Sequence, residues 1–326
     1  MSLNDSKSLH SMKRQIIRKL PANIKFTKFQ KERLYWELLC IRLDYEVAGR
    51  FIEYIDQHKF EVDNFLSSLD VESRNNLNKV IENLEYMNTH TLVQTLQKFT
   101  SNMDKLLEHL NYLESIKNDY ILPLELHEEG IFKYKHGLNY LPQEVIKGLR
   151  GSVFLDCGAF TGDSASMFEK EYFPSSIYSF EPNPENLSYL SETIKYNKLE
   201  RVFPVNKAVG EESGVINFSL LGISSCVSDS GSNEIEVASI DEFVKNNNLS
   251  VGLIKMDLEG YEFEALNGAK KTIKQFNPVL LISIYHHPEE LFGTKKLIQE
   301  ITPQYNFKIR HLADIRPLGE IHLIGW

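Results

Sequence analysis

The chain has 326 residues, of which 42% are hydrophobic, and its formal net charge is −9 at pH 7. This composition supports globular cores and excludes collagen-like and disordered chains, and the length suggests two domains. Acidic residues outnumber basic ones by 45 to 36. Because proteins bind nucleic-acid phosphates through clustered lysine and arginine, a nucleic-acid partner is not expected.

No segment predicts secretion or membrane insertion. The N-terminus is polar, and the longest apolar run, residues 279–285, is far shorter than the ~20 residues of a spanning helix. The cysteines at positions 40, 157 and 226 lie far apart without a C-x-x-C pair, so neither a disulfide framework nor a zinc site is indicated. We therefore expect a soluble cytoplasmic protein without a transmembrane segment.

The N-terminal part of the chain has the pattern of helices. Residues 28–117 contain no proline and a single glycine, Gly49, and their apolar residues recur every three or four positions. Asp70 is expected to cap the helix that contains Leu77. We therefore interpret residues 1–120 as an all-α region.

A heptad-like seam of apolar residues within this region indicates that one face of it packs against another helix. Its apolar residues step alternately by four and three: Leu92, Leu96, Phe99, Met103, Leu106, Leu110 and Leu113. Such a seam buries against another helix, either in a helical hairpin within the chain or in a contact with a second copy. Sequence does not separate the hairpin from a homo-oligomer.

From residue 151 onward, strands and helices alternate. Strands are expected at 153–155, 177–180, 201–210, 214–220, before Asp257, from 278 and, as a closing antiparallel pair, at 306–312 and 320–326. Helices are expected between them, at 184–196, at 239–246 and after Gly260. This alternation predicts an α/β domain over residues 121–326, with a mostly parallel sheet, helices on both faces and ligands at the carboxyl ends of the strands.

The segment DCGAFTGD, residues 156–163, predicts a cofactor turn. Gly158 and Gly162 would make the tight strand-to-helix connection on which nucleotide-type cofactors bind. About 20 residues later, the segment FEPNPEN brings Glu181 to the place where such folds bind ribose hydroxyls, with Asn183 close behind it.

The charges around the turn indicate which cofactor it binds. Asp156 and Asp163 would repel the pyrophosphate of a dinucleotide. S-adenosyl-L-methionine has no phosphate and carries a sulfonium and an amino group, so the same carboxylates would attract it. Phe160 also stands where a pyrophosphate needs a glycine. We favour S-adenosylmethionine; an NAD(P)-dependent oxidoreductase and a non-catalytic helical assembly protein remain the alternatives.

Polar residues after the later strands are candidates for the chemistry. Asp257 and Glu259 follow one strand, His286 follows the next, and His311 lies in the closing pair. A hydroxyl acceptor has to lose a proton, and histidine titrates near neutrality, so we expect His286 to be the base, with His311 as a second candidate. Asp257 and Glu259 would hold the acceptor. A divalent ion bound by these residues is the alternative, but no local ligand motif supports it, and no metal is expected.

Five segments in this order, DCGAFTGD, FEPNPEN, VNKAVG, IKMDLEGYE and YHHPEEL, resemble the FkbM family of S-adenosylmethionine-dependent methyltransferases. The resemblance covers roughly residues 124–326 and leaves out the helical part. It implies a class I methyltransferase (Rossmann-like) fold and O-methylation, often of sugar hydroxyls in glycan or natural-product pathways, and so a small-molecule or glycan acceptor. It assigns cofactor contacts to Asp156, Gly158, Ala159, Gly162, Glu181, Asn206 and Ala208, the last two beside the adenine.

Overall fold

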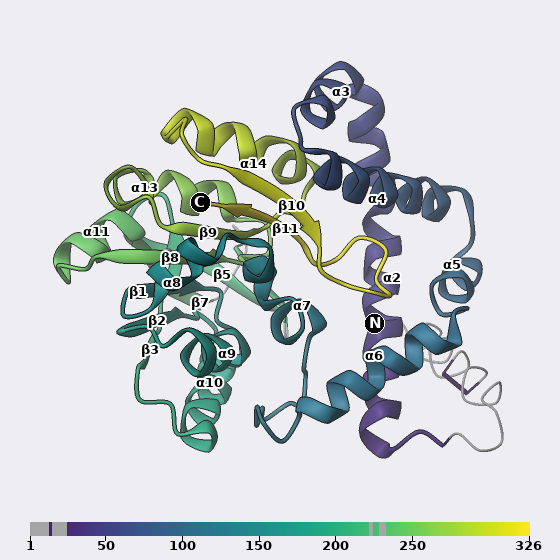
Figure 1. The fold of residues 1–326 in the computed structure, drawn as a ribbon, viewed down its shortest axis with the longest axis horizontal. Coiled ribbons are helices and arrows are strands. Elements are labelled where there is room, and N and C mark those ends of the chain that lie inside the picture. The colour runs from purple at the N-terminus through teal and green to yellow at the C-terminus, as the bar shows by residue number, and fades with distance from the viewer. Residues whose placement is uncertain (1–12, 15–24, 222–223, 228–232) are drawn as a thin grey trace. The chain divides into compact units, whose positions relative to one another are not determined.

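The computed structural model describes residues 13–14, 25–221, 224–227 and 233–326 (Figure 1). The chain divides into two compact units. Unit 1 comprises Met1–Asn118 and His311–Ile321, and unit 2 comprises Asp119–Arg310 and His322–Trp326. A short C-terminal segment that the sequence pattern placed in the α/β domain therefore belongs to the helical unit.

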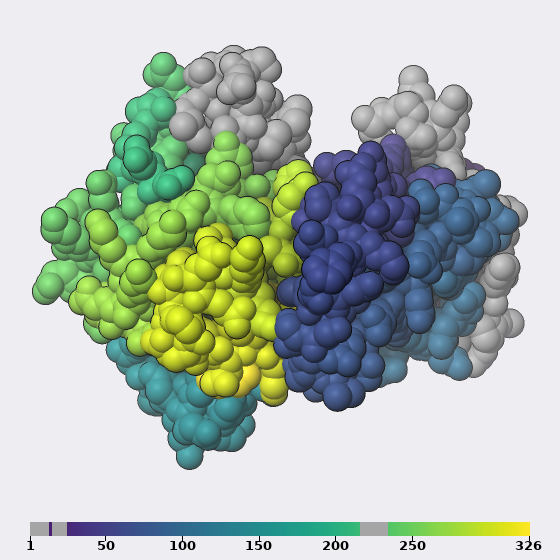
Figure 2. All heavy atoms as spheres, turned by 90° about the horizontal axis from the view of Figure 1, so that it is seen from above, coloured from purple at the N-terminus to yellow at the C-terminus, as the bar shows by residue number. Residues whose placement is uncertain are grey.

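Several described helices of unit 1 begin after a residue whose side chain caps them. Thr27 forms a capping box with Gln30, and Asp70 accepts the backbone N–H groups of Glu72 and Ser73, which confirms the predicted cap. The helices are α2 (Lys28–Gln57), α3 (Lys59–Ser67), α4 (Val71–Thr89), α5 (Leu92–Phe99) and α6 (Met103–Ile116). Figure 2 shows residues of α3 and α4, in dark blue, on the surface of unit 1.

The predicted heptad seam does not lie on one helix, so the expectation of a continuous repeat is wrong. The chain leaves the helical conformation after Phe99, and the Asn102 side chain accepts the Lys105 N–H to start α6. Three buried seam leucines, Leu96, Leu106 and Leu110, pack in one hydrophobic cluster with Leu34, Leu38 and Ile41 of α2. These leucines are buried within a single chain, as expected for a hairpin-like packing.

Asp44 of α2 holds the C-terminal segment of unit 1. Its Oδ2 accepts the backbone N–H groups of Leu318 and Gly319, both at 3.1 Å, and its Oδ1 lies 3.5 Å from Arg316 Nη2. Asp44 is buried, so these polar contacts are shielded from water. Ile315 of the same segment joins the hydrophobic cluster on α2.

Unit 2 is built on a seven-stranded sheet with the strand order β10, β11, β9, β8, β1, β2, β3. The strands are β1 (Val153–Cys157), β2 (Ser176–Phe180), β3 (Val202–Val205), β8 (Val251–Met256), β9 (Val279–Ser283), β10 (Phe307–His311) and β11 (Ile321–Gly325). The pairs from β9 to β3 are parallel, and β11 is antiparallel to β9. The prediction of a mostly parallel sheet is confirmed.

A smaller sheet of four strands has the order β4, β7, β5, β6. Its strands are β4 (Ala208–Gly210), β5 (Gly214–Leu221), β6 (Ser224–Val227) and β7 (Asn233–Ser239). The strand predicted at 201–210 is therefore two strands in two sheets, because the chain leaves β3 at Asn206. Pro204 fits β3 because this strand lies at the sheet edge, where a missing N–H is tolerated.

Helices cover both faces of the large sheet, with α9 and α10 on one side and α13 and α14 on the other (Figure 1). The helices of unit 2 are α7 (Glu129–Phe132), the 3₁₀ helix η1 (Lys135–Tyr140), α8 (Gln143–Leu149), α9 (Asp163–Tyr172), α10 (Pro184–Asn197), α11 (Ile240–Asn246), α12 (Glu262–Asn267), α13 (Lys270–Phe276) and α14 (Pro288–Ile301). Across the described residues, no helix has both the length and the apolar character needed to cross a membrane.

Candidate active site

Two glycines with positive φ shape the turn after β1, Gly158 at 78° and Gly162 at 85°. The N–H groups of Gly158 and Ala159 donate to the Phe180 carbonyl oxygen at 3.0 and 2.9 Å, which joins the turn to the end of β2. A Cβ atom on Gly158 would lie 1.9 Å from the Asp257 carbonyl oxygen. The end of β1 therefore touches the end of β8, and position 158 has room for glycine alone.

Asp156 and Lys255 form a buried ion pair next to this turn. Lys255 Nζ lies 3.3 Å from Asp156 Oδ1 and donates to the Gly158 carbonyl oxygen at 2.6 Å. Burial lowers the pKa of Lys255, but nearby carboxylates, Asp156 first among them, outweigh this effect and raise it. Lys255 therefore offsets the charge of Asp156, and the charge argument for the cofactor depends on other acidic residues.

Glu181 joins the two loops that form the predicted cofactor site. Its Oε2 accepts the Phe160 N–H at 2.9 Å, and its Oε1 accepts the Asn183 N–H at 2.9 Å and the Asn186 amide at 3.4 Å. Burial raises the pKa of Glu181 to about 7, although these hydrogen bonds oppose the shift. The carboxylate is thus held in place and keeps capacity for one further hydrogen bond, since it offers about four acceptor positions.

The other predicted cofactor residues also lie at strand ends. Asp163 is buried at the start of α9, and burial raises its pKa to about 7 against the opposing effect of Lys255. The Asn183 side chain accepts the Glu185 N–H and caps α10. Asn206 is exposed between β3 and β4, and Ala208 begins β4. The candidates therefore follow β1, β2 and β3, which are neighbours in the sheet.

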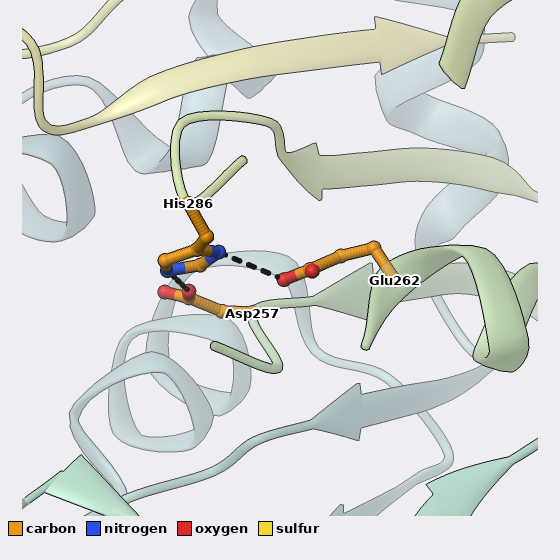
Figure 3. A group of neighbouring side chains, drawn as sticks. All are labelled: Asp257, Glu262 and His286. Atoms are coloured by element: carbon orange, nitrogen blue, oxygen red, sulfur yellow. Dashed lines mark ion pairs between the residues drawn. The ribbon is translucent and has the colours of Figure 1, made fainter. Parts of the chain in front are cut away.

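A second group of polar residues surrounds His286, in the loop after β9. Figure 3 shows its ring between the carboxylates of Asp257 and Glu262. Nε2 lies 3.4 Å from Asp257 Oδ1 and 3.9 Å from Glu259 Oε2, and Nδ1 lies 3.1 Å from Glu262 Oε1. Burial lowers the pKa of His286, but Glu262, Glu259 and Asp257 outweigh it and raise the pKa to about 10.

Glu262 is the residue of this group that the sequence reasoning missed. It is fully buried, and its carboxylate accepts the N–H groups of Leu258 at 2.7 Å and Gly260 at 3.0 Å. Burial raises its pKa, but His286 outweighs this and lowers it to about 2. Glu290 of α14 contacts Glu262, and burial raises the pKa of Glu290 to about 9. The sequence offered one signal for Glu262, which is the last residue of the segment KMDLEGYE.

His311, the second histidine considered from sequence, and His287, the neighbour of His286, are placed differently. His311 belongs to unit 1, where its N–H donates to Asn76 Oδ1 at 3.2 Å, and burial lowers its pKa to about 4. His287 is the N-cap residue of α14, and its ring fills the space in front of Gly260, where a Cβ atom would lie 2.4 Å from the ring.

The two groups of residues meet at Asp257. Its backbone contacts the glycine turn, and its side chain, 28% exposed, faces His286. Chemically, one side of Asp257 offers a tight turn with acidic hydrogen-bond acceptors, and the other offers carboxylates and an imidazole able to bind hydroxyl groups and protons. Such an arrangement suits transfer of a group from a bound cofactor to a polar acceptor.

Comparison with known proteins identifies this region. Residues 156–309 match the model of the methyltransferase FkbM domain. A hexuronic acid methyltransferase, AglP of Haloferax volcanii, is 29% identical over 159 residues, which cover 46% of this chain and 65% of that protein. The match thus spans less than two thirds of the relative's length.

The fold is also found in a solved structure. The methyltransferase FkbM of Methylobacillus flagellatus KT superimposes with a TM-score of 0.58 at 20% identity, covering 84% of this chain and 60% of that one. At this identity the likeness shows the fold. The family match agrees with the resemblance seen in the sequence segments: residues 156–309 of this chain are similar to a methyltransferase FkbM domain.

Proposed function

We propose that this protein is an S-adenosylmethionine-dependent O-methyltransferase that acts on a hydroxyl of a sugar, glycan or natural product. One observation carries the proposal: the carbonyl oxygen of Asp257 touches Gly158 of the predicted cofactor turn, while the Asp257 side chain faces His286. A cofactor on the turn and an acceptor at His286 would therefore be neighbours.

The residues of the turn fit S-adenosylmethionine by their chemistry. Glu181 retains an acceptor position for a ribose hydroxyl, and Asp163 offers a carboxylate to a cationic ligand. Phe160, with a φ of 46°, stands in the turn where a pyrophosphate would need close approach to glycine. Asn206 and Ala208 would lie beside the adenine. The cofactor supplies, when bound, a methyl group on a positively charged sulfur.

The second group of residues would hold the acceptor and take its proton. In methyl transfer the acceptor oxygen forms the new bond to carbon, the electron pair of the carbon–sulfur bond stays on sulfur, and the hydroxyl proton leaves. Asp257 and Glu259, 28% and 53% exposed, would accept hydrogen bonds from the acceptor. His286 can receive this proton when its ring is neutral. At neutral pH the neighbouring carboxylates keep the ring in its cationic form, and Asp257 would then receive the proton instead.

The relative in Haloferax volcanii suggests where to search for the acceptor, because its name describes a methyltransferase of hexuronic acid. Neutral sugars would bind the acidic residues through their hydroxyl groups. A hexuronate carries its own carboxylate, which Asp257, Glu259 and Glu262 would repel unless a cation is present. A panel of acceptors should therefore contain matched pairs of hexoses and hexuronates.

Cofactor binding is the first test of this function. Calorimetry should show binding of S-adenosylmethionine and its demethylated product, with no binding of nicotinamide dinucleotides. Glu181→Ala should weaken binding by about 1 to 3 kcal/mol through loss of hydrogen bonds to the ribose. Binding of a nicotinamide dinucleotide alone would contradict the proposal and favour an oxidoreductase.

Activity is the second test. The protein and methyl-labelled cofactor are incubated with the acceptor panel, and labelled products are located by mass spectrometry. We expect transfer to an oxygen of one acceptor class. Cofactor binding together with transfer to nitrogen or carbon would contradict O-methylation.

A further inference from the structure

Three side chains from separate elements meet beside the cofactor turn. Asp257 follows β8, Glu262 begins α12, and His286 lies between β9 and α14. One ligand atom from each lies within 4.8 Å of the other two (Figure 3). Donor atoms around a single ion, at about 2.0 to 2.4 Å from it, are separated by distances of this size. We propose that these three residues bind a divalent cation.

The charges of the group favour a cation. Three carboxylates, those of Asp257, Glu259 and Glu262, surround the single imidazole of His286. Among the described residues, no lysine or arginine forms an ion pair with Asp257 or Glu262; Lys255, the nearest candidate along the chain, pairs with Asp156. A divalent cation would offset the excess negative charge in a place that is largely shielded from water.

The geometry is that of a prepared site. Glu262 is fully buried and held by two backbone N–H groups, which orient its oxygens toward His286 as supporting hydrogen bonds orient metal ligands. The His286 side chain is 10% exposed; its Nδ1 lies 3.1 Å from Glu262 Oε1, and its Nε2 lies 3.4 Å from Asp257 Oδ1. The three ligand atoms therefore already face one another, as the ligands of a prepared metal site do.

The mixed nitrogen and oxygen ligands indicate the kind of ion. Carboxylates suit Mg²⁺ and Mn²⁺, and imidazole suits the transition metals, so Mn²⁺ matches the set best among these ions. This role rests on the proposed function: a cation beside the acceptor would lower the pKa of its hydroxyl, and the proton would leave more easily before the oxygen takes the methyl group. Binding of the ion itself does not depend on that function.

Calorimetric titration of chelator-treated full-length protein with MnCl₂ tests the site. We expect one Mn²⁺ per chain, with weaker binding of Ca²⁺. Asp257→Asn should weaken Mn²⁺ binding at least 10-fold, and Glu262→Gln should do the same. Glu264→Gln is the matched control, since it changes a glutamate of the same helix that lies outside the group. Equal Mn²⁺ affinity in wild type and Asp257→Asn, or no binding to wild type, would overturn the proposal.

Two further measurements separate this inference from the proposed function. Thermal unfolding of each variant, measured without metal, shows whether lost Mn²⁺ binding reflects lost folding; Asp257→Asn, at a partly exposed residue, should unfold like wild type. Mn²⁺ binding without methyl transfer to any acceptor would support the cation site and contradict the function. Full methyl transfer in chelator, without Mn²⁺ binding, would support the function and overturn the cation site.

Discussion

At the residue scale, burial changes the chemistry of the carboxylates in two different ways. Glu181 and Asp163 lie at the predicted cofactor turn, where burial raises their pKa values to about 7. Glu262 is equally buried, but His286 outweighs burial and lowers its pKa to about 2. The first two residues therefore titrate near neutrality, while Glu262 stays ionised.

Cofactor affinity should consequently depend on pH. The ionised forms of Glu181 and Asp163 accept hydrogen bonds and attract the cationic cofactor, and these forms are lost as pH falls below about 7. Calorimetry at pH 6, 7 and 8 should show that the affinity for S-adenosylmethionine rises with pH and levels off above pH 8. Ionisation of each of the two carboxylates can raise this affinity by at most tenfold per pH unit. Equal or tighter binding at pH 6 would contradict this assignment.

His286 should matter for turnover and not for cofactor binding. Its ring contacts Asp257 and Glu262 and none of the predicted cofactor residues. Loss of a group that takes up the acceptor proton costs about 10² to 10⁴ in rate, so His286→Ala should lose that much turnover above about pH 10, where the His286 ring is neutral. Once an acceptor is known, steady-state kinetics measure the loss, and calorimetry checks the cofactor. His287→Ala should have a smaller effect; full activity of His286→Ala would assign the proton to Asp257.

At the scale of elements, the contact between β1 and β8 determines what the turn tolerates. Gly158→Ala would place a methyl group 1.9 Å from a backbone oxygen and strain a φ of 78°. We expect Gly158→Ala to lower stability by several kcal/mol and to abolish cofactor binding, as measured by denaturant unfolding and calorimetry.

Gly148 provides the matched control for this substitution. It lies in α8, and a Cβ atom there would meet nothing within 4 Å. Gly148→Ala should raise stability by up to about 1 kcal/mol, because alanine favours the helix. Equal changes of stability in Gly158→Ala and Gly148→Ala would show that the close contact at Gly158 does not cause the loss of stability.

The packing of Asp44 against residues 311–321 gives a second prediction at this scale. Asp44→Ala would leave two buried N–H groups without their acceptor and remove one partner of Arg316, which also pairs with Glu320. The expected loss of stability is about 2 to 4 kcal/mol by denaturant unfolding. Asp63→Ala, at an exposed position of α3, should change stability by less than about 0.5 kcal/mol. An equally small change of stability in Asp44→Ala would show that the packing of residues 311–321 does not depend on Asp44.

At the scale of the whole molecule, each unit has its own buried core, and the predicted cofactor residues all belong to unit 2. Replacing Leu106 and Leu110, both fully buried in unit 1, with aspartate should unfold that unit, since burial is lost and charges are left without partners. Circular dichroism should show lost helix, while calorimetry should show retained cofactor binding.

Leu43→Asp is the control for this experiment, because Leu43 lies on α2 but is 49% exposed. It should melt like wild type. Unchanged melting of the double variant would contradict the core described for unit 1. Loss of cofactor binding in the double variant, with unit 2 still folded, would show that the units are coupled.

Local properties of the sequence determined the turn after β1, the alternation of strands and helices, and the helix cap at Asp70. The tight turn after β1 was predictable because glycine spacing and a buried strand are short-range signals, and the alternation of strands and helices predicted the parallel sheet. The cap at Asp70 was equally local. The helix break before Met103 was overlooked because a heptad spacing does not register that Asn102 can start a new helix.

Contacts between distant parts of the chain were decided only by the tertiary structure. Asp156 and Lys255 pair because the register of β1 with β8 sets them side by side, so the charge of Asp156 is offset in a way that its own neighbours in sequence do not reveal. Residues 311–321 join unit 1 through Asp44, a partner 274 residues away from Leu318. His286 meets Glu262 because the loops after β8 and β9 turn toward each other at the same sheet edge; spacing along the sequence does not contain the directions of those loops.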